Sequence, residues 1–286
     1  VYIFDDSFSA LDYKTDATLR AELKEKTAES TVMIAAQRIS TILHADQIIV
    51  LEDGQIVGKG THKELLKNCE AYYQIASSQL SEKELEENLG IPVVLEKDVN
   101  MLYYWDKYDK KLSDEGVGIG VYIGTGVGNA IFINGKPLAG KDGVAGELGH
   151  IPMIGGTSQC GCGNLGCSEC YASGWKLVEL KEEYYPNVDM NDLFVKKSND
   201  TVLKNFVDNI ACVACAEINI LNPDSIIFGG GVINMKGFPK DYLEERLYVH
   251  ARKPYPAESL EIQYSEDKVD NGVKGAIIFA KTLLEK

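Results

Sequence analysis

The sequence has no G-x-x-x-x-G-K-[ST] segment, so it lacks the backbone cradle and the lysine with which many proteins hold nucleotide phosphates. It also lacks an apolar run of membrane-spanning length and a secretory signal. Basic side chains are few, with 29 Lys and Arg against 43 Asp and Glu, and the net charge of -14 argues against nucleic acid as a partner. We therefore expect a cytoplasmic α/β protein, whose 286 residues can build one or two cores.

A histidine and three cysteines stand close together in a glycine-rich stretch, residues 146–174. They are His150, Cys160, Cys162 and Cys167, with the spacing H-x9-C-x-C-x4-C. Three thiolates and one imidazole are the ligand set of a closed structural zinc site, and the glycines between them let a short loop fold back on itself. The sequence therefore predicts zinc here. The alternatives are buried apolar thiols and disulfides, the latter weaker because nothing marks the chain as secreted.

The first eighty residues alternate between predicted strands and helices. Residues 1–6 form an apolar run that ends in Asp5 and Asp6, which is typical of a buried parallel strand that presents carboxylates to a metal ion. Because the chain starts inside this strand, we expect it to be a piece of a longer reading frame. The other elements are a helix, a second buried strand, a hairpin turned at Asp53-Gly54 and a helix with a Thr61/Glu64 capping box, at residues 16–28, 31–37, 47–60 and 61–79.

Residues 1 to about 82 resemble the C-terminal end of the nucleotide-binding domain of ABC exporters. Asp5 falls at the Walker B aspartate, Asp6 at the catalytic glutamate, Asp12 in the D-loop and Gln37 at the switch histidine. The resemblance implies a first domain, 1–82, that is a partial P-loop NTPase sheet with exposed edges and weak docking. Asp6 is shorter than glutamate, and Gln37 cannot take up a proton. With no Walker A loop and no LSGGQ signature, we expect a vestigial segment that does not hydrolyse ATP by itself.

Residues after 90 predict a second α/β region. A buried strand at 91–100 leads into Asp98 at the start of a helix, where a carboxylate faces free backbone N–H groups; a plain helix cap is the alternative. Residues 116–138 predict two strands around a glycine-rich turn at 124–128, with a further turn at Asn134-Gly135. Because a strand follows the glycines, they are not a dinucleotide-binding fingerprint. They form either a phosphate-facing turn or an ordinary glycine hairpin.

The rest of this region supplies further core elements. Helices are expected near 169–184 and 200–221, and Asn222-Pro223 ends the second of them. Cys212 and Cys215 lie among apolar residues of that helix, so we expect both in the core. Residues 224–232 predict a buried strand that opens into three glycines, where a ligand can approach the backbone closely. A last strand and a last helix complete the chain.

The segments GELGH at 146–150 and CGCGNLGC-x-E at 160–169 resemble the signature of the ROK family of sugar kinases. The resemblance covers the second domain, 83–286, and is nearest to the D-allose kinase and glucokinase-like branches. It implies the C-terminal lobe of an actin-like, ribonuclease-H-like α/β fold and ATP-dependent phosphorylation of an aldohexose, with Mg–ATP as cosubstrate. It also implies a homodimer. An ABC partner subunit is implied only if the N-terminal segment is functional.

The resemblance places the family's roles on individual residues. Asp98 would be the general base that takes the proton of the attacking sugar hydroxyl. Glu147, His150 and Glu169 would hydrogen-bond sugar hydroxyls, and one ring nitrogen of His150 would do so while the other binds zinc. Lys97 takes a substrate-binding position where the family usually has Asn. The phosphates would be approached by the turn with Gly124, Thr125, Gly126 and Gly128. The nucleotide side would be lined by Gly229, Gly230 and Gly231.

Two departures from the family pattern decide the expected activity. Lys97 only donates hydrogen bonds and adds a charge, whereas Asn both donates and accepts. The family's N-terminal lobe, with its D-x-G-G-T phosphate loop and half of the sugar cleft, is missing, and the ABC-like segment stands in its place. Half a cleft leaves the transferring group in water, so we expect a kinase lineage that is weak or inactive as this chain. The alternatives are an ABC-transporter ATP-binding subunit fragment and a non-catalytic fusion of the two.

Overall fold

A computed structural model describes most of the chain, and it forms two compact units, Val1–Leu95 and Glu96–Lys286. Four predictions fall outside the described residues: those for Asp6, Asp12 and Gln37, and nearly all of the helix at 16–28. The predicted boundary near residue 82 also lies outside them and stays a prediction. The described residues are 1–5, 23, 26–27, 30–36, 39–43, 45–52, 54–77, 85–86, 90–266 and 268–284.

The Val1–Leu95 unit contains two separate pairs of strands. β1 (Tyr2–Asp5) runs parallel to β2 (Val32–Ala35). β3 (Ile48–Glu52) and β4 (Gln55–Gly60) are antiparallel, and Gly54 has φ +76° in the turn between them, which confirms the hairpin. The helices of this unit are α2 (Ile39–Ile42), α3 (His62–Asn68) and α4 (Glu70–Ser77).

Two predictions for this unit need correction. The strands at 1–6 and 31–37 form, but they are not buried: Ile3 is 74% exposed and Met33 is 54% exposed. A two-stranded sheet has too little surface to bury both of its faces. The predicted helix at 61–79 is two helices, because α3 ends at Cys69 in an extended conformation. Its capping contact is present, since the Glu64 carboxylate accepts a hydrogen bond from the Thr61 N–H at 2.8 Å.

The Glu96–Lys286 unit is built around a five-stranded sheet with the strand order β7-β6-β5-β8-β9. β5, β8 and β9 are parallel, while β6 is antiparallel to both β5 and β7. The predicted turn at Asn134-Gly135 is present, with φ of 49° and 76°. The strands are β5 (Val117–Ile123), β6 (Val127–Ile133), β7 (Lys136–Pro137), β8 (Ser225–Gly229) and β9 (Glu261–Tyr264).

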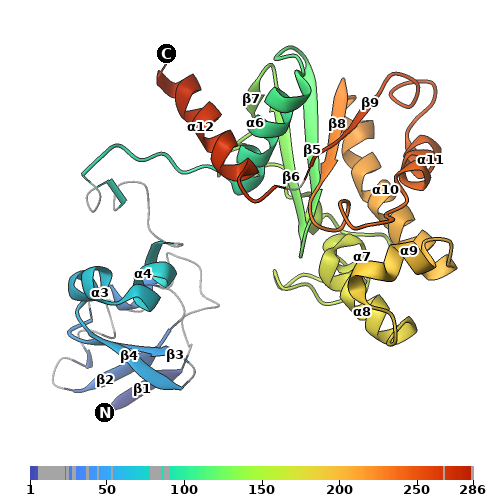
Figure 1. Cartoon of the computed structure of the whole chain (residues 1–286). Coiled ribbons are helices and arrows are strands. Elements are labelled where there is room, and N and C mark those ends of the chain that lie inside the picture. The colour runs from blue at the N-terminus through green and yellow to red at the C-terminus, as the bar shows by residue number, and fades with distance from the viewer. Residues whose placement is uncertain are drawn as a thin grey trace. The chain divides into compact units, whose positions relative to one another are not determined.

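Helices cover both faces of this sheet (Figure 1). On one face α6 (Asp98–Lys110) and α12 (Asn271–Leu284) pack against Tyr122, Phe132 and Ile227. On the other face α10 (Thr201–Leu221) lies against the opposite side chains of β5 and β8, and α11 (Lys240–His250) packs on α10. The remaining elements are η1 (Leu148–His150), α7 (Glu169–Ala172), α8 (Gly174–Tyr184), η2 (Met190–Asp192) and α9 (Leu193–Lys197).

Three expectations for this unit are wrong in detail. Residues 92–97 form no strand, and Val94 is 54% exposed; the Val93 N–H donates to the Glu86 side chain at 3.0 Å and not to a neighbouring strand. The helix near 169–184 is interrupted at Ser173, which caps α8 by accepting a hydrogen bond from the Lys176 N–H. In α10, Cys215 is buried as expected, but Cys212 is exposed. The end of α10 at Asn222, in a left-handed conformation, is as predicted.

The parallel order of β5 and β8 places two glycine-rich turns at the same edge of the sheet. The first turn follows Ile123, and the second follows Gly229. Their backbones touch: the Val232 N–H donates to the Ile123 carbonyl at 3.0 Å, and a Cβ at Gly230 would lie 2.5 Å from that oxygen. In parallel sheets, ligands bind at this edge. Among the described residues, no helix is long and apolar enough to cross a membrane.

Candidate functional site

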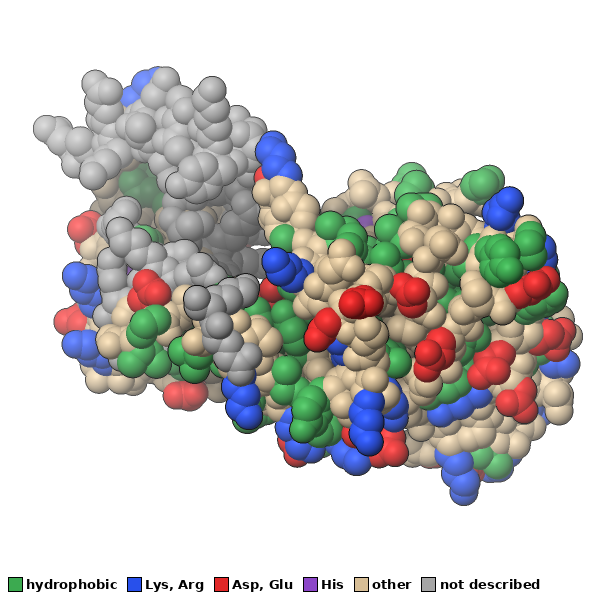
Figure 2. Space-filling model, turned by 90° about the horizontal axis from the view of Figure 1, so that it is seen from above, with side chains coloured by type: hydrophobic (Ala, Val, Ile, Leu, Met, Phe, Trp, Pro, Cys, Tyr) green, Lys and Arg blue, Asp and Glu red, His purple; other side chains and the backbone are tan. Residues whose placement is uncertain are grey.

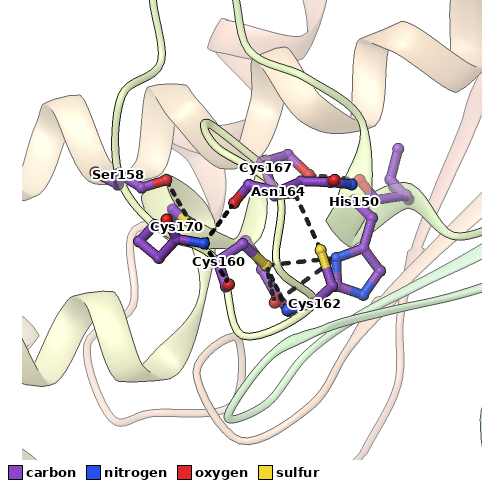
Figure 3. Close-up of polar contacts among 11 residues, drawn as sticks. His150, Ser158, Cys160, Cys162, Asn164, Cys167 and Cys170 are labelled. Atoms are coloured by element: carbon purple, nitrogen blue, oxygen red, sulfur yellow. Dashed lines mark hydrogen bonds and ion pairs between the residues drawn. The ribbon is translucent and has the colours of Figure 1, made fainter. Parts of the chain in front are cut away.

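His150, Cys160, Cys162 and Cys167 converge on one point beside the sheet edge. Their ligand atoms all lie within 4.8 Å of one another. The Cys162 and Cys167 sulfurs are 3.6 Å apart, and the Cys160 sulfur is 3.7 Å from His150 Nδ1. Figure 3 shows the imidazole and the sulfurs turned toward this common point. The spacing in the sequence therefore corresponds to a spatial cluster.

Backbone hydrogen bonds fold the loop that carries the cysteines back on itself. The Met153 N–H donates to the Gly166 carbonyl at 2.8 Å, and the Cys160 N–H donates to the Asn164 carbonyl at 2.9 Å. Gly166 has φ +75°, and a Cβ there would lie 2.6 Å from the Gly156 carbonyl oxygen. Only glycine fits this crossing, so the glycines of the loop bring the sulfurs together.

The donor set and its spacing fit a zinc ion. Tetrahedral zinc with Zn–S bonds of about 2.3 Å requires sulfurs about 3.8 Å apart, close to the separation of Cys162 and Cys167. All seven cysteines of the chain are free, so no disulfide competes for these thiols. Their environments differ: the Asn164 N–H lowers the pKa of Cys162, while burial raises the pKa of Cys167. The exposed Cys162 also argues against a cluster of apolar core thiols.

Glu169 connects this cluster to the glycine-rich turn. It is the first residue of α7, and its Oε1 accepts a hydrogen bond from the Cys160 thiol at 3.0 Å and lies 3.8 Å from His150 Nδ1. Its Oε2 lies near Gly126, where a Cβ would approach it to 3.1 Å. Two of the predicted sugar-binding residues, His150 and Glu169, are thus neighbours.

The turn at 124–126 is fixed by the start of α8. The N–H groups of Gly174 and Trp175 donate to the carbonyls of Gly124 and Thr125 at 2.8 and 3.1 Å. A side chain at Gly174 would collide with the Gly124 carbonyl, since its Cβ would be 2.3 Å from the oxygen. The turn therefore has a defined shape, and the sequence analysis did not identify Gly174 as the residue that sets it. The signal in the sequence is the pair Ser173-Gly174, in which a serine that can cap a helix precedes a residue without a side chain.

Asp98 is the first residue of α6, one position inside the helix cap, which is Lys97. Its Oδ1 accepts a hydrogen bond from the Val99 N–H at 2.8 Å, and the side chain is exposed. Val99 packs against the glycine turn, because a Cβ at Gly128 would lie 2.6 Å from its Cγ1. The predicted base and the predicted phosphate turn are therefore adjacent in space. The role of each stays a prediction.

Lys97 joins α6 to the GELGH segment. Its Nζ donates to Glu147 Oε1 and to the Ala145 carbonyl, both at 2.8 Å. Two residues predicted to bind the sugar thus form an ion pair with each other. Glu147 caps η1, whose last residue is His150. The chain of contacts runs from Lys97 through Glu147 to the metal cluster.

Asp5 is the one ABC-like site residue in the described part of the chain, and it ends β1.

The sequence analysis also missed a polar pair in the core beneath the GELGH segment, Asn129 and Glu217. Their signal was an Asn inside the apolar strand 127–133 and a Glu inside the apolar helix 201–221. On one face of the molecule, Figure 2 shows acidic, basic and hydrophobic side chains interspersed.

Two groups of known proteins are similar to this chain over different stretches. N-acetyl-D-glucosamine kinase of Escherichia coli is 29% identical over 199 residues, which are 63% of this chain and 65% of the kinase. An uncharacterized ABC transporter ATP-binding protein of Mycobacterium tuberculosis is 48% identical over 79 residues near the N-terminus, which are 28% of this chain and 14% of that protein. The chain thus spans less than two thirds of the length of either relative.

Solved structures and a family model agree on the larger part. The ROK hexokinase of Thermus thermophilus superimposes with a TM-score of 0.60 at 24% identity, covering 71% of this chain and 70% of that one. A ROK family glucokinase of Streptomyces griseus, in complex with glucose and AMPPNP, gives 0.59 at 20%, covering 94% and 88%. A ROK family transcriptional regulator gives 0.58 at 20%, covering 99% and 70%. These likenesses show the fold. The ROK family model matches residues 68–283, and the chain belongs to the ROK family.

Proposed function

We propose that the Glu96–Lys286 unit is the zinc-binding, C-terminal part of an ATP-dependent aldohexose kinase. The observation that carries this proposal is the continuous contact from Lys97, beside Asp98, through Glu147 to His150 and Glu169 at the metal cluster. Glu169 of this group lies beside Gly126, in one of the two glycine-rich turns at the edge of the sheet. A neutral sugar needs several such acceptors and donors, whereas a purely structural loop does not.

The proposed division of work follows from the positions of these groups. Asp98, whose exposed carboxylate stands at the first residue of α6, takes the proton of the attacking hydroxyl. Glu147, Glu169 and His150 hold sugar hydroxyls. The turn at 124–128 and the glycines at 229–231 approach the nucleotide through backbone N–H groups. Zinc, when bound, fixes the loop and leaves the second nitrogen of His150 for the sugar.

Regarding turnover, we propose that this chain is weak or inactive by itself. About a third of the kinase relative lies outside the matched stretch, and phosphoryl transfer requires that sugar and phosphate be enclosed together. The Val1–Leu95 unit we propose to be a vestigial P-loop NTPase fragment of ABC type, in which Asp5 is all that the described residues retain of the site. A chain of this lineage that uses ATP would work in the cytoplasm, and homodimer formation is proposed from the family alone.

The experiment is a binding and turnover measurement on the zinc-loaded chain, with a panel of aldohexoses and Mg–ATP. We expect sugar binding in calorimetry, with ATP consumption that is slow and depends on added sugar. Asp98→Asn should leave sugar affinity within about threefold and lower any turnover by about 100-fold or more. ATP hydrolysis that is independent of sugar would instead favour the ABC reading. Failure to bind any sugar, with zinc in place, would leave a non-catalytic fusion.

A further inference from the structure

A buried polar pair lies in the apolar layer between β6 and α10. Asn129 is 3% exposed and Glu217 is 8% exposed. Asn129 Nδ2 donates to Glu217 Oε2 at 2.7 Å and to the Gly120 carbonyl at 3.3 Å. No cation contacts Glu217 among the hydrogen bonds and ion pairs of the described residues. A buried carboxylate without a cationic partner is costly, and such groups are common at functional sites.

The other end of the Asn129 amide faces the GELGH segment. Asn129 Oδ1 is buried and has no hydrogen-bond partner in the part of the chain that the structure describes. A Cβ at Gly146 would lie 2.5 Å from this oxygen, so the amide supports the backbone of Gly146 directly. Gly146 precedes Glu147, and it has φ +80°, a conformation that glycine adopts without strain.

We propose that Asn129 and Glu217 are positioning residues that set the backbone of residues 146–148, and that protonation of Glu217 selects between two orientations of the Asn129 amide. When Glu217 is ionised it accepts the amide N–H, and Oδ1 faces Gly146. When Glu217 carries a proton it can donate to Oδ1, and the reversed amide then presents its N–H groups to the Gly146 backbone. Glu147 and η1 follow the backbone of Gly146.

The electrostatic surroundings place this change near neutral pH. Burial raises the pKa of Glu217 to about 7, and the hydrogen bond from Asn129 limits the rise. Titratable groups on neighbouring elements include His150 on η1, Glu169, Cys170 and Tyr171 on α7, and Arg246 and His250 on α11. The last two are bound to Asp208. The causes of the Glu217 shift are burial and the hydrogen bond from Asn129, and none of these groups is among them.

The effect on the loop does not depend on the proposed kinase function, whereas any effect on sugar binding rests on it. In the zinc-loaded chain, we would follow the backbone amide resonances of Gly146 and Glu147 by NMR from about pH 5.5 to about pH 8.5. We expect both to shift with a midpoint near pH 7, and Glu217→Gln to abolish the shift. Gln keeps the shape and the acceptor but cannot ionise.

Asp106→Asn is the matched control. Asp106 is also a buried acid, on α6 at the opposite face of the sheet, where it accepts hydrogen bonds from Tyr122 and Ser265 at 2.9 and 2.6 Å. Burial raises the pKa of Asp106 as well. The control should leave the titration of Gly146 unchanged, because among the described residues the Asp106 carboxylate hydrogen-bonds to Tyr122 and Ser265 and to no residue of the loop.

Three outcomes would overturn the proposal. The first is a Gly146 amide that does not titrate near pH 7, and the second is a titration that survives in Glu217→Gln, which would belong to another group such as His150. If Glu217→Gln does not fold, the 13C carboxyl signal of Glu217 in the wild type decides, and a midpoint different from that of Gly146 is the third. In calorimetry, aldohexose affinity should change several-fold across the same midpoint. No sugar binding at all would remove the proposed function but leave the loop result standing.

Discussion

Apolar strand residues are exposed in one unit of the chain and buried in the other. In the Val1–Leu95 unit, Ile3 lies in β1 and is 74% exposed, whereas Phe228 in β8 of the second unit is fully buried. β8 has a strand on each side and a helical layer on each face. Among the described residues, β1 pairs with β2 only. An apolar run therefore specifies a buried strand only where partners cover both its edges and its faces.

The unit with the exposed strands is nevertheless the one with the higher sequence identity to its relative. The N-terminal stretch is 48% identical to its ABC relative but matches 14% of that protein. The C-terminal stretch is 29% identical to a sugar kinase and matches 65% of it. Identity reports ancestry, while burial depends on how much of the ancestral core is present. The following predictions test this contrast, from the largest expected effect to the smallest.

Removal of zinc should give the largest difference in stability change between the two units. Structural zinc sites contribute about 10 kcal/mol or more of binding free energy that appears as folding free energy. Chelation should therefore increase hydrogen exchange throughout the loop and α7 and lower the unfolding temperature of the Glu96–Lys286 unit. The Val1–Leu95 unit should not respond. Mass-spectrometric exchange, resolved by peptide, measures both units in one sample.

Cysteine variants provide the control for that experiment. Cys167→Ser should reduce bound zinc to almost none, because Cys167 is a buried member of the cluster. Cys212→Ser removes an exposed thiol on α10 and should leave the zinc content unchanged. Equal zinc loss in both variants would place the metal elsewhere.

Truncation of one apolar side chain in each unit should give unequal losses of stability. Phe228→Ala should lower the free energy of unfolding by about 3–5 kcal/mol, since it leaves a cavity between the sheet and α10. Ile3→Ala should change it by less than about 0.5 kcal/mol, because the side chain is exposed. Urea titration of each variant measures the difference. Similar losses would show that β1 is as well packed as β8.

The ionisation of Glu217 should make the stability of the folded chain depend on pH. Burial raises the pKa of Glu217 from its ordinary value of 4.5 to about 7 in the folded chain, so the folded state binds more protons between these values. Stability should therefore fall as pH rises through this window, and the loss is complete above pH 7. Glu217→Gln lacks this loss and should gain roughly 2 kcal/mol relative to wild type between pH 5 and pH 8. A constant difference across that range would contradict the assignment.

The smallest effect concerns Lys97. Lys97→Met should cost only about 0.5–1 kcal/mol, because the side chains of Lys97 and Glu147 are 24% and 49% exposed and water screens the pair. It should nevertheless speed amide exchange at residues 146–148. Lys176→Met is the matched control, since Lys176 and Glu179 on α8 have the same 2.8 Å separation and nearly the same exposure. Unchanged exchange in Lys97→Met would mean that the ion pair does not restrain the loop.

The sequence predicted local features of the second unit well. The turn at Asn134-Gly135, the end of α10 at Asn222 and the clustering of His150 with the three cysteines each depend on a few neighbouring residues, and each is confirmed. The α/β fold and the family followed from motifs of the same kind. Zinc occupancy and the roles of individual site residues stay predictions.

What the sequence did not predict depends on contacts between distant segments. Ile3 is exposed although β1 pairs with β2, and Val94 is exposed in a segment that forms no strand; an apolar pattern reveals neither. The ion pair of Lys97 with Glu147 joins residues fifty positions apart. The pair of Asn129 and Glu217 joins β6 to α10 across the core, and neither residue alone indicates its partner in the sequence.

The central claim is that one imidazole and three thiolates bind zinc and thereby orient Glu147, His150 and Glu169 as one wall of a sugar site. X-ray absorption at the zinc edge on the purified chain tests it most directly. The account predicts one shell of three sulfurs at about 2.3 Å and one nitrogen at about 2.0–2.1 Å. A sample without zinc, or with a shell of oxygen ligands, would contradict it.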